Sequence, residues 1–194
     1  EAANKLGFPT KKTMMIAQKL YEGIDLGSET TGLITYMRTD SIRLSDEFIH
    51  NTFNYIEKNY GKEYIGYVKT SKKKENVQDA HEAIRPTYID LEPETIKQYL
   101  SPEQYKLYKL IYNRFIASQM ASAIYDTMSV NIDVNTYNFR ATGQNLKFKG
   151  FMTLYVEVLE NEKEEIELSL PELQVDQEVI KQNINSKQSF TTPP

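Results

Sequence analysis

A tyrosine and an arginine lie two residues apart in a segment whose residue types favour an extended backbone. They are Tyr36 and Arg38, in the run GLITYMRTDS at residues 32–41. Side chains two residues apart on an extended backbone share a face, so we expect these two to point the same way. A phenol has a pKa of roughly 10 and is a poor nucleophile at neutral pH unless a base or a nearby cation favours the phenolate. A guanidinium can do this, and it can also bind a phosphate through two parallel hydrogen bonds.

A second segment, DAHEAIRPT at residues 79–87, changes the weight given to this tyrosine. The chain has 14 tyrosines and only two histidines, so a tyrosine by itself is weak evidence of catalysis. In the second segment His81 stands beside Glu82 and four residues before Arg85, in a turn that Pro86 closes. Tyrosine, arginine, histidine and glutamate are the side chains that phosphoryl transfer to a protein nucleophile requires.

Taken together and in this order, the segments LITYMRTDS (33–41) and AHEAIRPT (80–87) resemble two motifs of bacterial type IA DNA topoisomerases, the active-site tyrosine motif and the downstream HEAIRP motif. The similarity runs nearly from end to end, because three further stretches also resemble that family: residues 6–23, 106–120 and 190–194. The resemblance implies an isomerase that relaxes negatively supercoiled DNA. Such an enzyme cuts one strand, holds its 5′ phosphate on the tyrosine, passes another strand through the gap and reseals the cut.

The resemblance also assigns roles to individual residues. Tyr36 corresponds to the nucleophile, Arg38 to the cation that positions the scissile phosphate, and His81 to the histidine that supports the site. Glu82 and Arg85 match the motif as well, but an ion pair that holds the loop, or a helix cap, is the favoured interpretation for them. Thr39 to Ser41 fit a turn into the next helix, because such side chains hydrogen-bond to their own backbone.

The family's metal site implies that part of the catalytic apparatus lies outside this chain. In that family an acidic cluster in an amino-terminal domain binds Mg²⁺, and the same domain supplies a general-acid glutamate and a phosphate-binding lysine. We find none of these in the sequence and expect no metal ligands here, so the chain is interpreted as a fragment that is inactive alone. The implied partners are a single-stranded segment of negatively supercoiled DNA and the amino-terminal metal-binding and gate domains of the same protein.

Composition limits the possible locations and folds. The chain has 194 residues, 40% of them hydrophobic, which is enough for one large or two small cores. It has no cysteine, which excludes disulfides and cysteine zinc sites. No apolar run approaches the roughly 18 residues that indicate a membrane span. We therefore expect a soluble protein of the bacterial cytoplasm, associated with the nucleoid as the family resemblance implies.

The charges indicate where DNA would bind. The net charge is −4, but residues 1–121 hold 17 Lys and Arg against 16 Asp and Glu, whereas residues 122–194 hold 6 against 11. Phosphate contacts usually dominate the affinity for DNA, so they are expected in the first part. The candidates are Lys11, Lys12, Arg43 and Arg85. The lysine run at 72–74 is interpreted as a solvated loop in preference to a phosphate contact.

The hydrophobic pattern changes near residue 121. Before that point, helical spacing with capping residues predicts helices over 10–23, 45–61 and 101–120, and a short helix that begins at Pro93. Residues 62–78 are polar and predict a loop. The pattern predicts a mostly α-helical domain at 1–121 that carries Tyr36.

After residue 121, alternation predicts an antiparallel β domain at 122–194, and hence an α+β fold overall. One strand is predicted at 127–134 with one face in water, and a hairpin at 137–149 that turns at residues 143–145. Further strands are predicted at 154–159 and 179–184, with the acidic stretch 160–167 as a solvated hairpin tip. In the family that this chain resembles, the β domain arches over the DNA gate.

Two other function classes remain open at this point. Tyrosine recombinases also use tyrosine, arginine and histidine to form a covalent DNA link, but their tyrosine follows the other residues in sequence, whereas Tyr36 precedes His81. A non-catalytic helical DNA-binding module would use Tyr36 and Arg38 only to contact backbone phosphates. A 3′ phosphate on the tyrosine would indicate the first class, and DNA binding without cleavage the second.

Overall fold

The computed structural model describes residues 1–67, 81–155 and 170–180, together with residues 182, 183, 185, 186, 188, 190 and 191. It has helices and small antiparallel sheets, which confirms the α+β prediction. The chain divides into two compact units, one of Glu1–Ile124 with Leu146–Glu164 and the other of Tyr125–Asn145 with Glu165–Pro194. The domain boundary predicted near residue 121 stays a prediction, and each unit is described here by itself.

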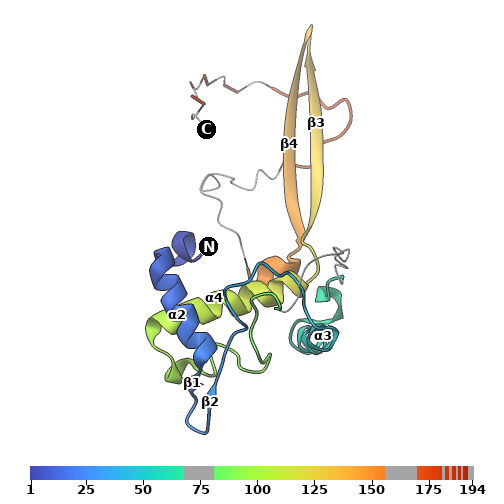
Figure 1. Cartoon of the computed structure of the whole chain (residues 1–194). Helices are drawn as coiled ribbons and strands as arrows, with labels where there is room; N and C mark the ends of the chain where they lie inside the picture. The colour runs from blue at the N-terminus through green and yellow to red at the C-terminus, as the bar shows by residue number, and fades with distance from the viewer. Residues whose placement is uncertain are drawn as a thin grey trace, which may run out of the picture. The chain divides into compact units, whose positions relative to one another are not determined.

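Four α-helices are present in the described ranges: α1 (Ala2–Leu6), α2 (Thr10–Glu22), α3 (Asp46–Tyr60) and α4 (Pro102–Gln119) (Figure 1). The three longer ones confirm the predicted helices. The hydroxyl of Ser45 accepts a hydrogen bond from the Phe48 N–H at 3.3 Å, and Ser101 forms a complete capping box with Gln104. No helix in these ranges is both long enough and apolar enough to cross a membrane.

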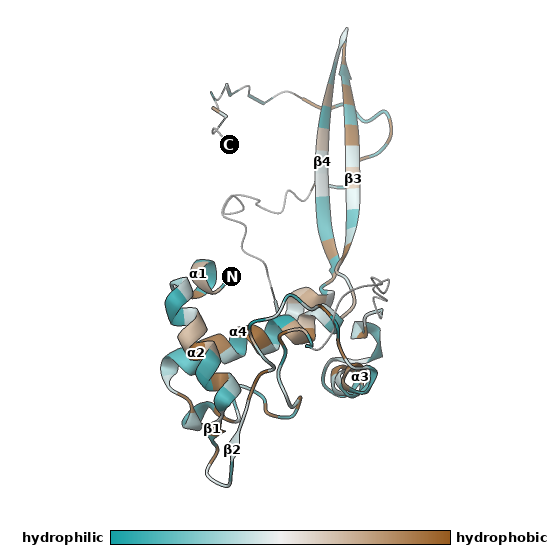
Figure 2. Cartoon of the chain, viewed as in Figure 1, coloured by the Kyte–Doolittle hydropathy of each residue, from teal (hydrophilic) through white to brown (hydrophobic). Residues whose placement is uncertain are grey.

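Helix α4 is the centre of the hydrophobic core of the first unit. It packs against α2 and α3, and its buried side chains include Tyr108 and Ile116, both fully buried. Leu20 of α2 and Ile56 of α3 are also fully buried. Figure 2 shows hydrophobic residues along these helices. The core therefore holds the ends of α2 and α3 in place, and the segments that carry the two sequence motifs lie next to those ends.

Two short predictions in the first unit need correction. The helix predicted to begin at Pro93 is absent; residues 93–95 form a turn, which is followed by a 3-10 helix at Lys97–Tyr99. The turn forms because the Thr95 N–H and hydroxyl both bind the Glu92 carbonyl, and too few residues precede the cap at Ser101 for a full helix. In the predicted loop at 62–78, residues 62–64 form a 3-10 helix and Ile65 pairs with Met120, whereas 68–78 lie outside the described residues.

The β hairpin that follows α4 has its turn at a different position from the predicted one. Strands β1 (Ile24–Asp25) and β2 (Thr30–Thr31) form a short antiparallel pair, and β3 (Ile124–Val134) and β4 (Tyr137–Phe148) form a long two-stranded sheet. The predicted turn at 143–145 is wrong, because β4 runs through these residues. The chain reverses instead at Asn135, whose φ of 54° is a left-handed conformation that asparagine tolerates.

The long two-stranded sheet also differs in burial. Figure 2 shows hydrophobic and hydrophilic residues alternating along its strands, as predicted. In the described chain, however, most residues of both faces are exposed, so the predicted buried face is not found. Of the later predicted strands, the described residues of 154–159 and 179–184 belong to no strand, and the acidic stretch 160–167 lies outside the described residues.

Candidate active site around Tyr36

The segment that carries Tyr36 lies directly against the end of α2. The Leu33 N–H donates to the Leu20 carbonyl at 2.7 Å. A Cβ at Gly32 would lie only 2.7 Å from the carbonyl oxygen of Tyr21, so only glycine permits this close approach. Leu33 and Ile34 are both almost completely buried. The backbone just before Tyr36 is therefore fixed by the core.

The second motif binds the other edge of this segment. Ile34 pairs with Pro86 in an antiparallel bridge. The Thr35 N–H donates to the Arg85 carbonyl at 3.0 Å, and the Thr87 N–H donates to the Leu33 carbonyl at 3.1 Å. The two motifs, about fifty residues apart in sequence, are thus brought side by side.

This pairing places His81 next to Tyr36. The ring centroids of Tyr36 and His81 are 5.2 Å apart, and a second ring, that of Tyr21 on α2, meets the Tyr36 ring edge-on at 5.4 Å. Tyr36 is half-buried and His81 is exposed. Among the described residues the Tyr36 hydroxyl has no hydrogen-bond partner. The Tyr36 ring thus contacts two other rings, while its oxygen accepts and donates no hydrogen bond within the described chain.

Tyr21 is a site residue that the sequence did not identify. The helical spacing of α2 assigns it to the apolar stripe that faces the core, yet 40% of its surface is exposed and its ring packs on Tyr36. Local sequence does not indicate this role, because the close approach of Gly32 to the end of α2 forms only in the folded structure.

The chain bends at Met37 and Arg38, where the prediction assumed a continuous extended backbone. That the Arg38 and Tyr36 side chains share a face stays a prediction. Met37 is buried and Arg38 is exposed. Within the part of the chain that the structure describes, Arg38 makes no ion pair or hydrogen bond. Its guanidinium is thus unengaged and close to Tyr36 in sequence.

The turn after Arg38 is formed as predicted. The Thr39 hydroxyl accepts from the Ser41 N–H at 3.0 Å, and the Ser41 hydroxyl accepts from the Arg43 N–H at 3.2 Å. The Arg43 carbonyl then accepts from the Ala83 N–H at 2.8 Å. These residues connect the tyrosine motif to α3 and hold the second motif from another side.

Glu82 and Arg85 bind each other, as the favoured interpretation expected. The Arg85 Nε donates to the Glu82 carboxylate at 2.8 Å and one terminal nitrogen donates to the Pro86 carbonyl at 2.8 Å. The guanidinium also lies over the ring of Phe48, 3.7 Å from its centroid. Only 12% of the Arg85 side chain is exposed. Its donors are used inside the protein.

The other predicted DNA contacts have varied surroundings. Lys11 is exposed at the start of α2, and Lys12 is partly exposed but forms an ion pair with Glu103 and lies over the Phe8 ring. Arg43 is exposed. The lysine run at 72–74 lies outside the described residues.

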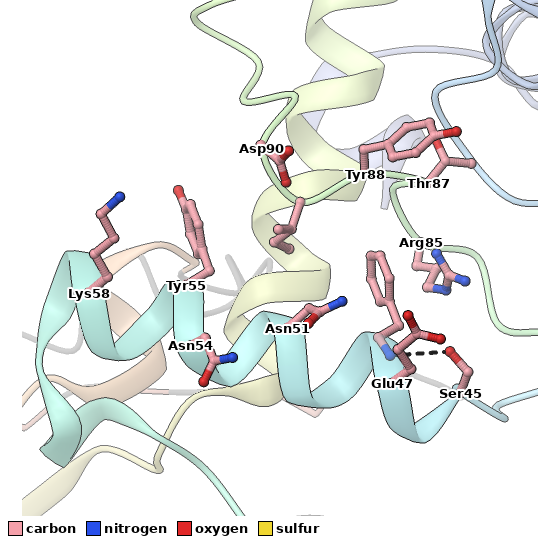
Figure 3. A pocket seen from close by; sticks show the side chains of 12 residues that line it. Ser45, Glu47, Asn51, Asn54, Tyr55, Lys58, Arg85, Thr87, Tyr88 and Asp90 are labelled. Atoms are coloured by element: carbon pink, nitrogen blue, oxygen red, sulfur yellow. Dashed lines mark hydrogen bonds between the residues drawn. The ribbon is translucent and has the colours of Figure 1, made fainter.

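A hollow of about 650 Å³ lies beside this site, between one side of α3 and the segment 85–90 (Figure 3). Lys58 and Arg85 line it, but so do Glu47 and Asp90, so its charges are balanced. A polyanion such as DNA gains little electrostatic attraction from a surface with balanced charges. The described residues also include no group of three His, Asp or Glu side chains that could hold a metal ion.

Comparisons with known proteins give the family of this chain. A family model described as DNA topoisomerase matches residues 1–194. The structure of full-length topoisomerase I from Thermotoga maritima matches with a TM-score of 0.69 and 41% sequence identity, over 79% of this chain and 25% of that one.

The chain belongs to the DNA topoisomerase family. This confirms the resemblance that the two sequence motifs carry. The chain spans about a quarter of the length of the Thermotoga protein that it matches.

Proposed function

We propose that this chain is the nucleophile-bearing part of a type IA DNA topoisomerase, an isomerase that relaxes negatively supercoiled DNA. Tyr36 attacks a phosphodiester of one strand and becomes joined to its 5′ phosphate. A second strand passes through the gap, and the cut is then resealed. The observation that supports this best is the Tyr36 ring, which contacts two other rings while its hydroxyl has no hydrogen-bond partner among the described residues.

The chemistry is a transesterification that conserves the bond energy of the DNA. The Tyr36 oxygen forms a bond to phosphorus and loses its proton, while the bond from phosphorus to the 3′ oxygen breaks and that oxygen takes up a proton. Resealing is the reverse reaction, so no external energy source is required. A ring that is already in place spares the entropy of ordering it at the reaction.

Arg38 and His81 are proposed to act on the phosphate. Arg38 is exposed and unengaged in the described chain, so it is available to bind the scissile phosphate with its two-pronged donor face. His81 supports the site from its position against the Tyr36 ring. Lys11, Lys12 and Arg43 are proposed as phosphate contacts farther along the strand.

The metal is proposed to bind elsewhere in the longer protein. The described residues do not offer a ligand set that fits Mg²⁺, which prefers several oxygen ligands at near-octahedral positions. When bound in an amino-terminal domain, Mg²⁺ would supply charge neutralisation near the phosphate. We therefore propose that this chain alone forms no covalent DNA adduct, and that the metal-binding and gate domains of the same bacterial cytoplasmic protein complete the site.

Labelled oligonucleotides test the proposal. The full-length enzyme is incubated with single-stranded DNA and Mg²⁺, denatured, and the adduct is mapped by peptide sequencing and by the labelled end that stays attached. We expect a 5′-phosphate linkage on Tyr36, and no adduct when the present chain is used alone. A 3′ linkage would indicate the tyrosine-recombinase class, and binding without any adduct would indicate the non-catalytic module.

A further inference from the structure

Thr35, the residue before Tyr36, has a hydroxyl that joins the two motifs. It donates to the Ala83 carbonyl at 2.7 Å and accepts from the Arg85 N–H at 2.9 Å. The Thr35 N–H adds a third bond, to the Arg85 carbonyl. Pro86, which pairs with Ile34, has no N–H and cannot donate to such a pairing. The hydroxyl thus supplies hydrogen bonds at the point where the backbone pairing is incomplete.

The Arg85 side chain fixes the same loop from its other side. It binds Glu82 three residues earlier and the Pro86 carbonyl one residue later, so it determines how the backbone of 82–86 is folded. Its contact with the Phe48 ring attaches this loop to the first turns of α3. The described residues of the loop, 81–85, form no helix or strand, so these contacts are what hold its shape.

We infer that Thr35 and Arg85 are positioning residues that hold the His81 imidazole against the Tyr36 ring. The inference rests on the proposed function in so far as it concerns cleavage, but its geometric part does not. Ala83 and Arg85 are two and four residues after His81, so their bonds to Thr35 set where His81 lies. Neither Thr35 nor Arg85 needs to touch DNA for this. A displacement of about 1 Å at a reacting group can cost on the order of a hundredfold in rate.

Thr35→Val is the first test, because valine has nearly the same shape but no hydroxyl. Thr87→Val is a matched control, since the Thr87 hydroxyl donates to the Gly32 carbonyl in the same pairing but on the side away from His81. Thr35→Ser keeps the hydroxyl. In the full-length enzyme we expect Thr35→Val to lower the single-turnover cleavage rate at least tenfold with an unchanged Kd for DNA. Both Thr35→Ser and Thr87→Val should stay within about threefold of the wild type. Equal rates for Thr35→Val and Thr87→Val would overturn the inference.

Arg85 separates positioning from DNA contact. Lysine keeps the charge but loses the planar fork and the stacking on Phe48. A positioning role predicts that Arg85→Lys loses about as much cleavage as Arg85→Ala, while the Kd for DNA and its salt dependence stay as in the wild type. A phosphate contact predicts that only Arg85→Ala weakens binding and lowers the salt slope, by about one unit for one contact. That result would overturn the positioning role of Arg85.

A readout that needs no activity completes the test. NMR of the present chain should show cross-relaxation between the His81 and Tyr36 rings in the wild type and in Thr87→Val, and its loss in Thr35→Val. Persistence of this signal in Thr35→Val would overturn the geometric part. If Tyr36 proved not to be the nucleophile, the proposed function would fail while the NMR result would still decide the positioning of His81.

Discussion

Tyr108 and Tyr112 on α4 have buried rings, and their hydroxyls donate hydrogen bonds to backbone carbonyls. The Tyr36 ring is only half-buried, and its hydroxyl has no hydrogen-bond partner in the described chain. Tyr108 donates to the Leu91 carbonyl at 2.7 Å and Tyr112 to the Ile89 carbonyl at 2.5 Å. Tyr55 on α3 belongs with them, because its hydroxyl donates to the Glu92 carboxylate at 2.9 Å. These three tyrosines attach the segment 89–92 to the helices.

The buried tyrosines of α3 and α4 have raised pKa values. Burial raises the pKa of Tyr108 and of Tyr112 well above the ordinary value, and it raises the pKa of Tyr55 to about 12, with Glu92 adding to the effect. Such phenols are poor nucleophiles and good structural donors. Tyr36, by contrast, is fixed through its ring and its backbone, and not through its hydroxyl.

Removing one phenol oxygen from each region, that of Tyr36 and that of Tyr112, gives the largest expected difference between them. In the full-length enzyme, Tyr36→Phe should abolish cleavage and change the free energy of unfolding by less than about 0.5 kcal/mol, because that oxygen has no hydrogen-bond partner among the described residues. Tyr112→Phe should instead cost about 1–3 kcal/mol, since it leaves the Ile89 carbonyl unpaired, and the folded enzyme should still cleave. Urea unfolding and adduct formation measure the two effects. Covalent adduct in Tyr36→Phe would contradict the assignment.

Arg38 tests whether an exposed guanidinium beside the nucleophile matters. Arg38→Ala should lower cleavage on the order of a hundredfold, because a donor to the charged phosphate is lost. Arg38→Lys keeps the charge without the planar fork and should fall between Ala and the wild type. Single-turnover cleavage of a labelled oligonucleotide gives both numbers. Wild-type rates in Arg38→Ala would make Arg38 a structural residue.

His81 tests the value of the ring contact itself. His81→Phe keeps an aromatic ring against Tyr36 but loses the nitrogen atoms, whereas His81→Gln keeps polar atoms and loses the ring. If both properties are used, each variant should lose roughly tenfold in cleavage rate, which is about 1.4 kcal/mol in activation free energy. A rate in His81→Phe equal to the wild type would show that the histidine acts only through packing.

The buried tyrosines give a prediction in alkali. The folded-state pKa of Tyr55 is raised to about 12, so above pH 10 the unfolded chain loses this proton before the folded chain does. The stabilisation is complete below pH 10 and is lost as the pH rises toward 12. Tyr55→Phe should therefore lose less stability than the wild type between pH 9 and pH 11. Parallel curves from urea unfolding at each pH would contradict the assignment of this loss to Tyr55.

The smallest expected effect is at the start of α4, far from the nucleophile in sequence. Ser101→Ala removes the hydroxyl that accepts from the Gln104 N–H in the capping box and should cost about 1 kcal/mol. Cleavage by the folded enzyme should not change. Thermal unfolding of the variant beside wild type measures the cost, and a matched loss of activity at low temperature would show that the core and the site are coupled more closely than proposed.

The sequence alone determined the local elements and the identity of the motifs. Caps such as Ser45 and Ser101 and the 3.6-residue spacing act over a few neighbouring residues, so the three long helices could be predicted. The order of the two motifs was sufficient for the family. The left-handed turn at Asn135 was missed because the glycine at 143 is a stronger local turn signal. In the structure, strand β4 runs through residue 143.

Only the tertiary structure decided how the motifs meet. The bonds from Thr35 to Ala83 and Arg85 join residues about fifty apart, and no local rule sets such a pairing. The ring of Tyr21 reaches Tyr36 because the core fixes the end of α2 and Gly32 admits the next segment. The Arg85 guanidinium is held inside the protein partly by its stacking on the Phe48 ring, and Phe48 belongs to α3. Side-chain roles of this kind follow from long-range packing, whose geometry exists only once the core has formed.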